Sequence, residues 1–190
     1  MRVRLHAVEL ASRANGPGLR SVVWFQGCTL GCLGCFNPGT HEADAGYETD
    51  VDSLAGQLLA APNIEGVSIS GGEPFQQPEA LAQLVTRLRE TPLSILVFSG
   101  YTLAHIRNLP DSTESLANID VLVAGPYVQS SHLGFGLLGS SNQRLHLLTC
   151  RYQPTDFAAL PASELILHRD GSVTVSGFRP GVPSKIGLSD

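Results

Sequence analysis

Short apolar runs alternate with amphipathic helical patterns through the first two-thirds of this 190-residue chain. The runs with the length and residue types of strands cover residues 21–26, 65–70, 93–98 and 119–123. Apolar residues recur at helical spacing in residues 51–58 and 81–88, and residues 102–109 are expected to form a short helix. Strands that alternate with helices predict parallel βα units, so we expect an α/β fold.

The length of the chain limits how this fold can close. With 43% hydrophobic residues it can bury a sizeable core, yet it is shorter than a closed eight-stranded βα barrel of ~250 residues. We therefore expect a partial (βα) barrel with an open side, in one domain over residues 1–190. Its core is expected over about 20–127, followed by a small C-terminal β extension over about 128–190. Strands are expected there at residues 145–150, 164–168 and 172–176, with a hairpin turn at 169–171.

Three of the four cysteines, Cys28, Cys32 and Cys35, lie within eight residues directly after the first predicted strand. Thiolates are soft ligands that suit iron–sulfur clusters or zinc, and a four-iron cluster with three cysteine ligands keeps one iron open. A Cys₃His zinc site that includes His41 is an alternative. Disulfides fit poorly, because three crowded cysteines cannot all pair internally. Cys150 stands alone in an apolar run and is expected to be a buried small hydrophobe.

The cysteine spacing C-x3-C-x2-C, followed by the aromatic Phe36, resembles the signature of radical S-adenosylmethionine (SAM) enzymes. A second element, GGEP at residues 71–74 after the second predicted strand, resembles the turn that helps this family hold the methionyl ammonium of SAM. Taken alone, this element would be interpreted as an ordinary strand-to-helix turn. Its distance from the cysteine loop favours the functional interpretation. The resemblance implies the radical SAM type of partial barrel, with a [4Fe–4S] cluster whose open iron is chelated by SAM.

Further stretches resemble the glycyl-radical activating enzymes within that superfamily: residues 16–20, 35–41, 120–127, 139–144 and a late GFRP at 177–180. The resemblance therefore covers most of the chain. Relatives commonly carry an acid where this chain has Ala124, so no role is assigned to that position. The site residues implied are Cys28, Cys32 and Cys35 for the cluster, and Phe36, Gly71, Gly72, Glu73, Pro74, Ser99 and Asn142 for SAM.

The activity implied by the resemblance is reductive cleavage of SAM to methionine and a 5′-deoxyadenosyl radical, which takes hydrogen from a glycine of a partner enzyme. No side chain is expected to act as a general acid or base, because the cofactor carries the chemistry. The implied partners are the large subunit of an anaerobic ribonucleotide reductase and a flavodoxin- or ferredoxin-type electron donor. Two alternatives stay open: a radical SAM enzyme acting on a small molecule or peptide, and a noncatalytic zinc or iron–sulfur module.

The predicted strands place these motifs together. The cysteines follow the first strand, the GGEP element the second, residues 99–101 the third and residues 125–127 the fourth. Because the functional groups of βα barrels collect at the carboxyl ends of the strands, we expect one site on one rim.

Charge and hydropathy exclude other classes of protein. The formal net charge is −5 and Lys185 is the only lysine, which argues against a nucleic-acid partner. No apolar run has the length of a membrane span, and the first 13 residues contain no apolar signal-peptide core. We expect no membrane partner and a cytoplasmic protein with reduced thiols.

Overall fold

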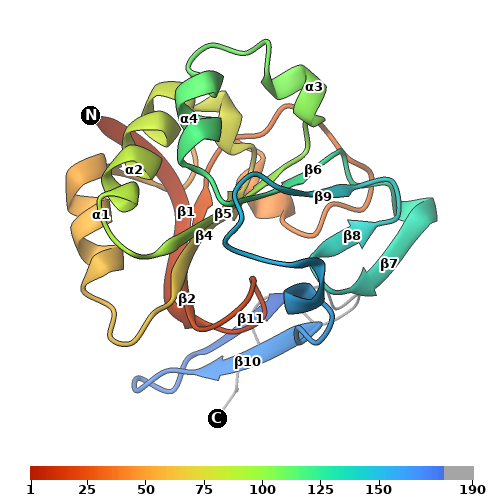
Figure 1. Cartoon of the computed structure of the whole chain (residues 1–190). Coiled ribbons are helices and arrows are strands. Elements are labelled where there is room, and N and C mark those ends of the chain that lie inside the picture. Colours follow the sequence, from red (N-terminus) through yellow and green to blue (C-terminus); the bar gives the residue numbers. More distant parts are fainter. Residues whose placement is uncertain (178–190) are drawn as a thin grey trace.

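The computed structural model describes residues 1–177, apart from the side chains of residues 134–135; most of the GFRP motif and Lys185 lie outside the described residues. A seven-stranded mixed sheet forms the centre of the fold (Figure 1). In spatial order its strands are β3 (Tyr47–Asp50), β1 (Arg2–Ser12), β2 (Arg20–Phe25), β4 (Gly66–Gly71), β5 (Ser94–Ser99), β6 (Val121–Ala124) and β9 (Arg144–Leu147). The four predicted strands are β2, β4, β5 and β6, which run parallel, and the α/β class is confirmed.

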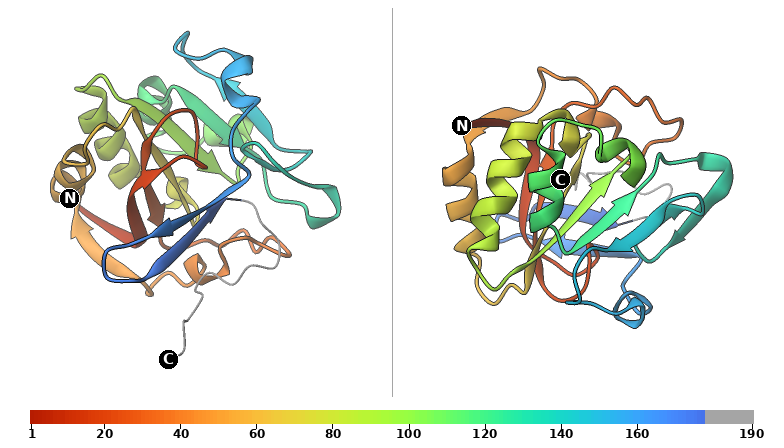
Figure 2. Two further views of the ribbon diagram at one scale, coloured as in Figure 1. Left: turned by 90° about the horizontal axis from the view of Figure 1, so that it is seen from below. Right: turned by 45° about the horizontal axis from the view of Figure 1, so that its top comes forward.

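Helices cover one face of this sheet, as the right-hand view of Figure 2 shows. They are α1 (Val51–Leu59), α2 (Pro78–Arg89), α3 (Leu103–Ile106) and α4 (Ser112–Asn118). Short 3₁₀ turns in other parts of the fold are η1 (Pro38–Thr40), η2 (Pro74–Gln76), η3 (Gln129–Ser131) and η4 (Pro154–Phe157). Helix α1 begins where the Asp50 carboxylate accepts hydrogen bonds from the amides of Asp52 and Ser53. Within residues 1–177, no helix combines the length and the apolar character that crossing a bilayer requires.

Apolar side chains pack on both faces of the sheet because successive residues of a strand point to opposite sides. In β5, Ile95 and Val97 join the larger cluster under the helices, whereas Leu96 joins a smaller cluster with Val121 and Phe157 on the other face. Burial on both faces explains the continuous apolar runs of β5 and β6. In β4, Ser68 instead alternates with Val67 and Ile69, and its hydroxyl accepts a hydrogen bond from Arg20.

Arg20 lies fully buried on the face away from the helices, among neutral partners. Its guanidinium donates to Ser68 Oγ at 2.7 Å, to Ser94 Oγ at 2.8 Å and to the backbone carbonyl of Val67 at 2.9 Å. Removal from water lowers the pKa of Arg20. This one side chain therefore joins β2, β4 and β5 at the rim where the parallel strands begin.

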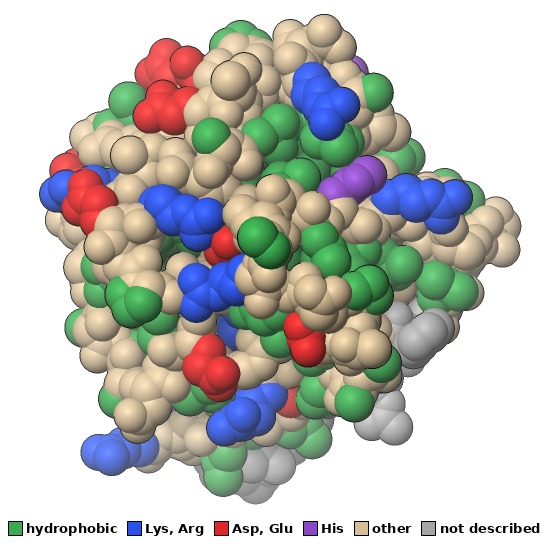
Figure 3. All heavy atoms as spheres, viewed as in Figure 1, with side chains coloured by type: hydrophobic (Ala, Val, Ile, Leu, Met, Phe, Trp, Pro, Cys, Tyr) green, Lys and Arg blue, Asp and Glu red, His purple; other side chains and the backbone are tan. Residues whose placement is uncertain are grey.

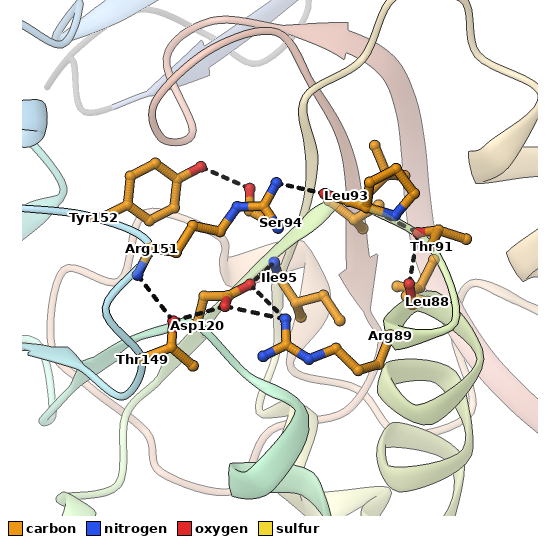
Figure 4. A network of polar contacts seen from close by, with 12 residues as sticks. Leu88, Arg89, Thr91, Leu93, Ser94, Ile95, Asp120, Thr149, Arg151 and Tyr152 are labelled. Carbon is orange, nitrogen blue, oxygen red and sulfur yellow. Dashed lines mark hydrogen bonds and ion pairs between the residues drawn. The ribbon is translucent and has the colours of Figure 1, made fainter.

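A second polar network lies at the same rim and is centred on Asp120, just before β6 (Figure 4). The buried Asp120 carboxylate pairs with Arg89 at 3.1 Å and accepts hydrogen bonds from Ile95 N at 2.9 Å and Thr149 Oγ1 at 2.8 Å. The network joins the end of α2, the start of β5 and the segment after β9. Polar residues at the amino ends of parallel strands serve stability rather than catalysis in barrel folds.

The C-terminal part forms two small antiparallel hairpins, β7 (His132–Phe135) with β8 (Leu138–Ser140) and β10 (Ser163–Leu167) with β11 (Val173–Gly177). The second hairpin turns through Gly171 at a φ of +84°, which confirms the predicted turn. Its Glu164 accepts a hydrogen bond from Arg13 N at 2.8 Å, and its Ser176 accepts one from Asn15 at 2.6 Å. The hairpin thus packs on the sheet face opposite the helices (Figure 2, left).

Three features differ from the sequence expectation. Two strands were not predicted: β1, which precedes β2 in the sequence, and β3, which follows the cysteines. These two strands pair antiparallel with each other. Helix α4 follows the single short helix expected at residues 102–109. The prediction that Cys150 is a buried hydrophobe is wrong, since this cysteine is exposed. Strand β9 ends at Leu147, and the hydrogen bond from Leu148 N to the Asp120 carbonyl, at 2.8 Å, is formed just beyond it. Cys150 lies in the turn that follows.

Candidate functional site

Four loops meet at the carboxyl ends of the parallel strands, as expected. We call them the cysteine loop (residues 28–35, after β2), the glycine turn (residues 71–74, after β4), the β5 loop (residues 99–101) and the β6 loop (residues 125–127). Backbone hydrogen bonds join them: Gly72 N donates to Phe25 O at 2.8 Å, and Gly125 N donates to Tyr101 O at 2.8 Å. Segments that are far apart in the sequence therefore form one continuous rim.

The glycine turn lies against the backbone that leads into the cysteine loop. A Cβ atom on Gly71, whose φ is +112°, would lie 2.3 Å from Phe25 N, and one on Gly72 would lie 2.2 Å from Gly27 O. Glu73 N also donates to Gly27 O at 2.9 Å. Both positions therefore require glycine for the packing of the protein itself. Their role in holding SAM stays a prediction.

Glu73 is completely buried, and its carboxylate joins two of the loops. Oε1 accepts hydrogen bonds from Phe75 N at 3.0 Å and from Ser99 Oγ at 2.9 Å, and Oε2 accepts one from Gly100 N at 2.7 Å. Burial raises the pKa of Glu73 to about 7, although these donors act in the opposite direction. Two predicted site residues, Glu73 and Ser99, are thus in direct contact, and Pro74 lies buried beside them.

The three loop cysteines are free thiols and half-buried. Cys28 N donates to the His41 carbonyl at 3.1 Å, and Cys35 N donates to the Cys32 carbonyl at 3.2 Å. Burial raises the pKa of both Cys28 and Cys35, and the charges of Glu73, Cys35 and Cys32 raise that of Cys28 further. Metal binding at these thiols therefore has to displace protons.

The donor set fits an iron–sulfur cluster better than a single zinc ion. In the part of the chain that the structure describes, no three His, Cys, Asp or Glu side chains are grouped to hold one metal ion. His41 contacts the cysteine loop through its backbone carbonyl, which accepts the hydrogen bond from Cys28 N. Three soft thiols on one loop, with the fourth cysteine after β9, instead suit a cluster that leaves one iron without a cysteine ligand.

Contacts hold the two ends of the cysteine loop to neighbouring loops. At its start, the side chain of Leu30 lies over Gly100, where a Cβ atom would come within 2.3 Å of Leu30 Cδ1. Beyond its end, the Phe36 ring packs on Tyr127 with 4.6 Å between ring centroids and on His132 with 5.6 Å. The predicted residue Phe36 thus connects the cysteine loop to the β6 loop.

Asn142 lies farther along this rim and is exposed. Its side-chain amide donates to the Pro126 carbonyl at 2.7 Å, and the adjacent Gln143 donates to the Gly125 carbonyl at 2.9 Å. Both residues hold the β6 loop in place. Contact with SAM at Asn142 remains a prediction.

Three glutamines of the site were missed by the sequence analysis. Gln26 Nε2 donates to Glu42 O at 2.7 Å, and Gln77 Nε2 donates to Gln26 O at 3.0 Å and to Arg4 O at 2.9 Å. Gln76 binds the cysteine loop at Thr29. The sequence marks them only by position: Gln26 ends the first predicted strand, and Gln76 and Gln77 follow the glycine turn after Phe75.

These glutamines line a cavity of about 300 Å³ next to Cys28. Arg2, Arg4, Glu48 and His41 also line it, so its wall is polar and carries both signs of charge. Arg4 and Arg2 both pair with Glu48, at 2.7 Å and 3.6 Å, so two positive charges share one negative charge there. On the face shown in Figure 3, acidic and basic side chains are likewise interspersed.

Comparisons with known proteins agree with this site. Residues 14–146 match a protein family described as a 4Fe-4S single cluster domain. The chain is 37% identical over 145 residues to the anaerobic ribonucleoside-triphosphate reductase-activating protein of Vibrio cholerae, covering 71% of this chain and 92% of that protein. It is also 39% identical over 92 residues to the pyruvate formate-lyase-activating enzymes of Clostridium pasteurianum and Staphylococcus aureus (strain USA300).

The extent of these matches differs. The matches to the pyruvate formate-lyase-activating enzymes cover 46% and 45% of this chain, and only 39% and 37% of those proteins. The Vibrio cholerae protein is matched over nearly its whole length. The family match, this relative and the three-cysteine loop together show that the chain belongs to the glycyl-radical activating enzymes of the radical SAM superfamily, whose cofactors are a [4Fe–4S] cluster and SAM.

Proposed function

We propose that this protein activates an anaerobic ribonucleotide reductase by taking a hydrogen atom from the Cα of one glycine in its large subunit. The reductase then stores the unpaired electron as a glycyl radical. The observation that carries this choice of partner is the 37% identity over 92% of the Vibrio cholerae activating protein. The pyruvate formate-lyase-activating enzymes share only part of their length with this chain.

Cys28, Cys32 and Cys35 would hold the cluster, and the glycine turn with Phe36, Ser99 and Asn142 would hold SAM. Bound there, the cluster and SAM would supply one-electron reduction of the SAM sulfonium, in which the S–C5′ bond breaks to give methionine and the 5′-deoxyadenosyl radical. The residues of the chain then have two tasks, to orient the reacting groups and to exclude other hydrogen donors. No side chain is required as a general acid or base.

Glu73 contributes to this function by holding the loops in place. Its two oxygens already accept three hydrogen bonds from within the protein, and the backbone amide of Tyr101 is a further donor nearby. A carboxylate offers about four acceptor positions, so little of its capacity is free for a ligand. We therefore propose that the SAM ammonium is bound mainly through the backbone shape of the glycine turn, which Glu73 fixes.

We further propose that the sheet is the partial barrel of radical SAM enzymes, that the whole chain acts as one domain, and that its open side receives the partner. The four parallel strands with helices on one face support the partial barrel. The exposed tip of the cysteine loop, where Leu33 is 79% exposed, supports an uncovered rim. A flavodoxin- or ferredoxin-type protein would supply the electron, in the cytoplasm, where thiols stay reduced.

The test is electron paramagnetic resonance on the reduced, reconstituted protein mixed with SAM and the anaerobic reductase of the same organism. We expect the doublet of a carbon-centred glycyl radical, and no doublet with the Cys32→Ala variant. Cleavage of SAM without the doublet would favour the radical SAM enzyme that acts on a small molecule or peptide. Failure to cleave SAM with a full cluster would favour the noncatalytic module.

A further inference from the structure

Gln76, the last residue of η2, makes a two-point contact with the residue that follows Cys28. Its side-chain oxygen accepts a hydrogen bond from Thr29 N at 3.1 Å, and its side-chain nitrogen donates to Thr29 Oγ1 at 2.7 Å. The same nitrogen donates its second hydrogen to the Tyr101 hydroxyl at 2.9 Å. Both donors and the acceptor of this amide are thus engaged.

The Tyr101 end of this bridge is itself fixed. Tyr101 N donates to Ser99 Oγ at 3.0 Å, and Tyr101 O accepts the hydrogen bond from Gly125 N. The Tyr101 ring also stacks on His105 with 4.4 Å between ring centroids. Gln76 therefore connects the start of the cysteine loop to a rigid part of the β5 loop.

The middle of the cysteine loop is held less firmly. Leu30 packs over Gly100, but a Cβ atom on Gly31 would meet no atom within 4 Å, and Leu33 is 79% exposed. The loop is thus open around residues 31–33, between two anchored ends. Beside Cys28, hydrogen bonds fix both neighbours, Gly27 against the glycine turn and Thr29 against Gln76. Cys35 is instead held by packing, because Phe36 lies on the Tyr127 ring.

We propose that Gln76 is a positioning residue for the cluster, which fixes the backbone at Thr29 and so presents the Cys28 thiol in one orientation. A loop that is already ordered loses less conformational entropy when it binds a ligand, and it releases that ligand more slowly. The net contribution of one hydrogen bond corresponds to about two- to tenfold in an equilibrium constant. Removing the Gln76 amide is therefore expected to weaken retention of the cluster by about that factor.

The test compares Gln76→Leu with Gln83→Leu, which makes the same chemical change on α2, where Gln83 contacts Asp52 on the surface. Two quantities are measured anaerobically: amide hydrogen exchange at Thr29 in the metal-free protein, and the rate at which reconstituted protein loses iron to a chelator. We expect Gln76→Leu to accelerate both the amide exchange of Thr29 and the loss of iron by about two- to tenfold. Its unfolding temperature should equal that of Gln83→Leu. Tyr101→Phe, which removes only the distal anchor, should show a smaller effect in the same direction.

Two results would overturn the proposal. One is iron loss from Gln76→Leu at the rate of Gln83→Leu. The other is faster exchange of Thr29 only in parallel with that of the core strands, which would show a general loss of stability. If Gln76→Leu does not fold, Thr29→Val tests the same proposal. This variant removes the hydrogen bond from Gln76 Nε2 to Thr29 Oγ1, and Thr29 is exposed. Wild-type iron retention in both Thr29→Val and Tyr101→Phe would then reject the proposal.

Discussion

Replacing Gly72 with alanine tests whether the glycine turn and the cysteine loop form one packed unit. The added methyl group would lie 2.2 Å from Gly27 O and 3.0 Å from Thr40 O, so the turn and the loop would have to separate by about 1 Å. That movement weakens the hydrogen bonds from Gly72 N to Phe25 O and from Glu73 N to Gly27 O. It also displaces Gly27, the residue before Cys28.

The magnitude follows from these contacts. Overpacking of a tight site costs about 1–3 kcal/mol, and each weakened hydrogen bond costs about 1 kcal/mol. With two weakened hydrogen bonds, we therefore expect a loss of about 3–5 kcal/mol in the free energy of unfolding, which lowers the unfolding temperature of a chain of this size by about 10 °C. Iron content after reconstitution should fall as well, because the first ligand position moves with Gly27.

The matched control is Gly56→Ala in α1, where the new Cβ atom meets no atom within 4 Å. Alanine is favoured over glycine inside a helix by about 0.5–1 kcal/mol, so this variant should unfold at a slightly higher temperature than the wild type. Circular dichroism during heating, with iron and sulfide analysis of the reconstituted protein, measures both outcomes. A Gly72→Ala variant as stable and as rich in iron as Gly56→Ala would refute the argument.

Three further predictions use other parts of the structure. Cys32→Ala should abolish the cluster and Cys150→Ala should retain it, as iron analysis will show; loss of iron only in Cys150→Ala would contradict the ligand assignment. Arg20→Met should lower the free energy of unfolding by about 3 kcal/mol or more in urea titrations, because buried acceptors lose their donor; a midpoint equal to the wild type would count against this. Since burial raises the pKa of Glu73 from its ordinary value of 4.5 to about 7, the folded state binds more protons over this range, and the stability of the metal-free protein should fall as pH rises from 4.5 to 7. Glu73→Gln should remove that component of the pH dependence, and an identical slope in both proteins would disprove it.

The parallel part of the fold was predictable because its strands are short runs rich in apolar residues, which serines interrupt in β4. Each of these strands is buried on both faces, so its sequence contrasts sharply with the polar loops on either side. Strand β1 carries a weaker signal: Val3 and Leu5 are buried, but Arg2 and Arg4 alternate with them and contact Glu48 of β3. An edge region of this kind depends on cross-strand ion pairs that no local pattern in the sequence reveals.

Helix α4 shows a different limit. Its buried residues are Ser112 and Ser115, so it has no apolar stripe from which a helical period could be recognised. It begins after Asp111, which adopts a left-handed φ of 54° without a capping hydrogen bond from its side chain. Packing against α2 rather than an intrinsic pattern therefore determines this helix.

The loops of the site were predictable, but most of their side-chain contacts were not. Ser99 was identified through its place after a strand, and the structure shows it bound to Glu73. Gln76 and Gln77 act through contacts with Thr29, Arg4 and other residues distant in the sequence. Amide side chains make such contacts in many surroundings, so their residue type alone indicates no particular role.

The alignment of the loops depends on the register of the strands that carry them. Phe25 of β2 pairs with Gly71 of β4, and Ser99 of β5 pairs with Ala124 of β6, so the four loops leave the sheet at nearly the same height. A slip of one residue between β2 and β4 would turn every side chain of β4 to the opposite face. A slip that brings Glu73 to the place of Gly72 would also put a Cβ atom about 2.2 Å from Gly27 O. The tight contact at the glycine turn therefore excludes a slip in that direction, and burial of one face of β4 opposes the slip in the other.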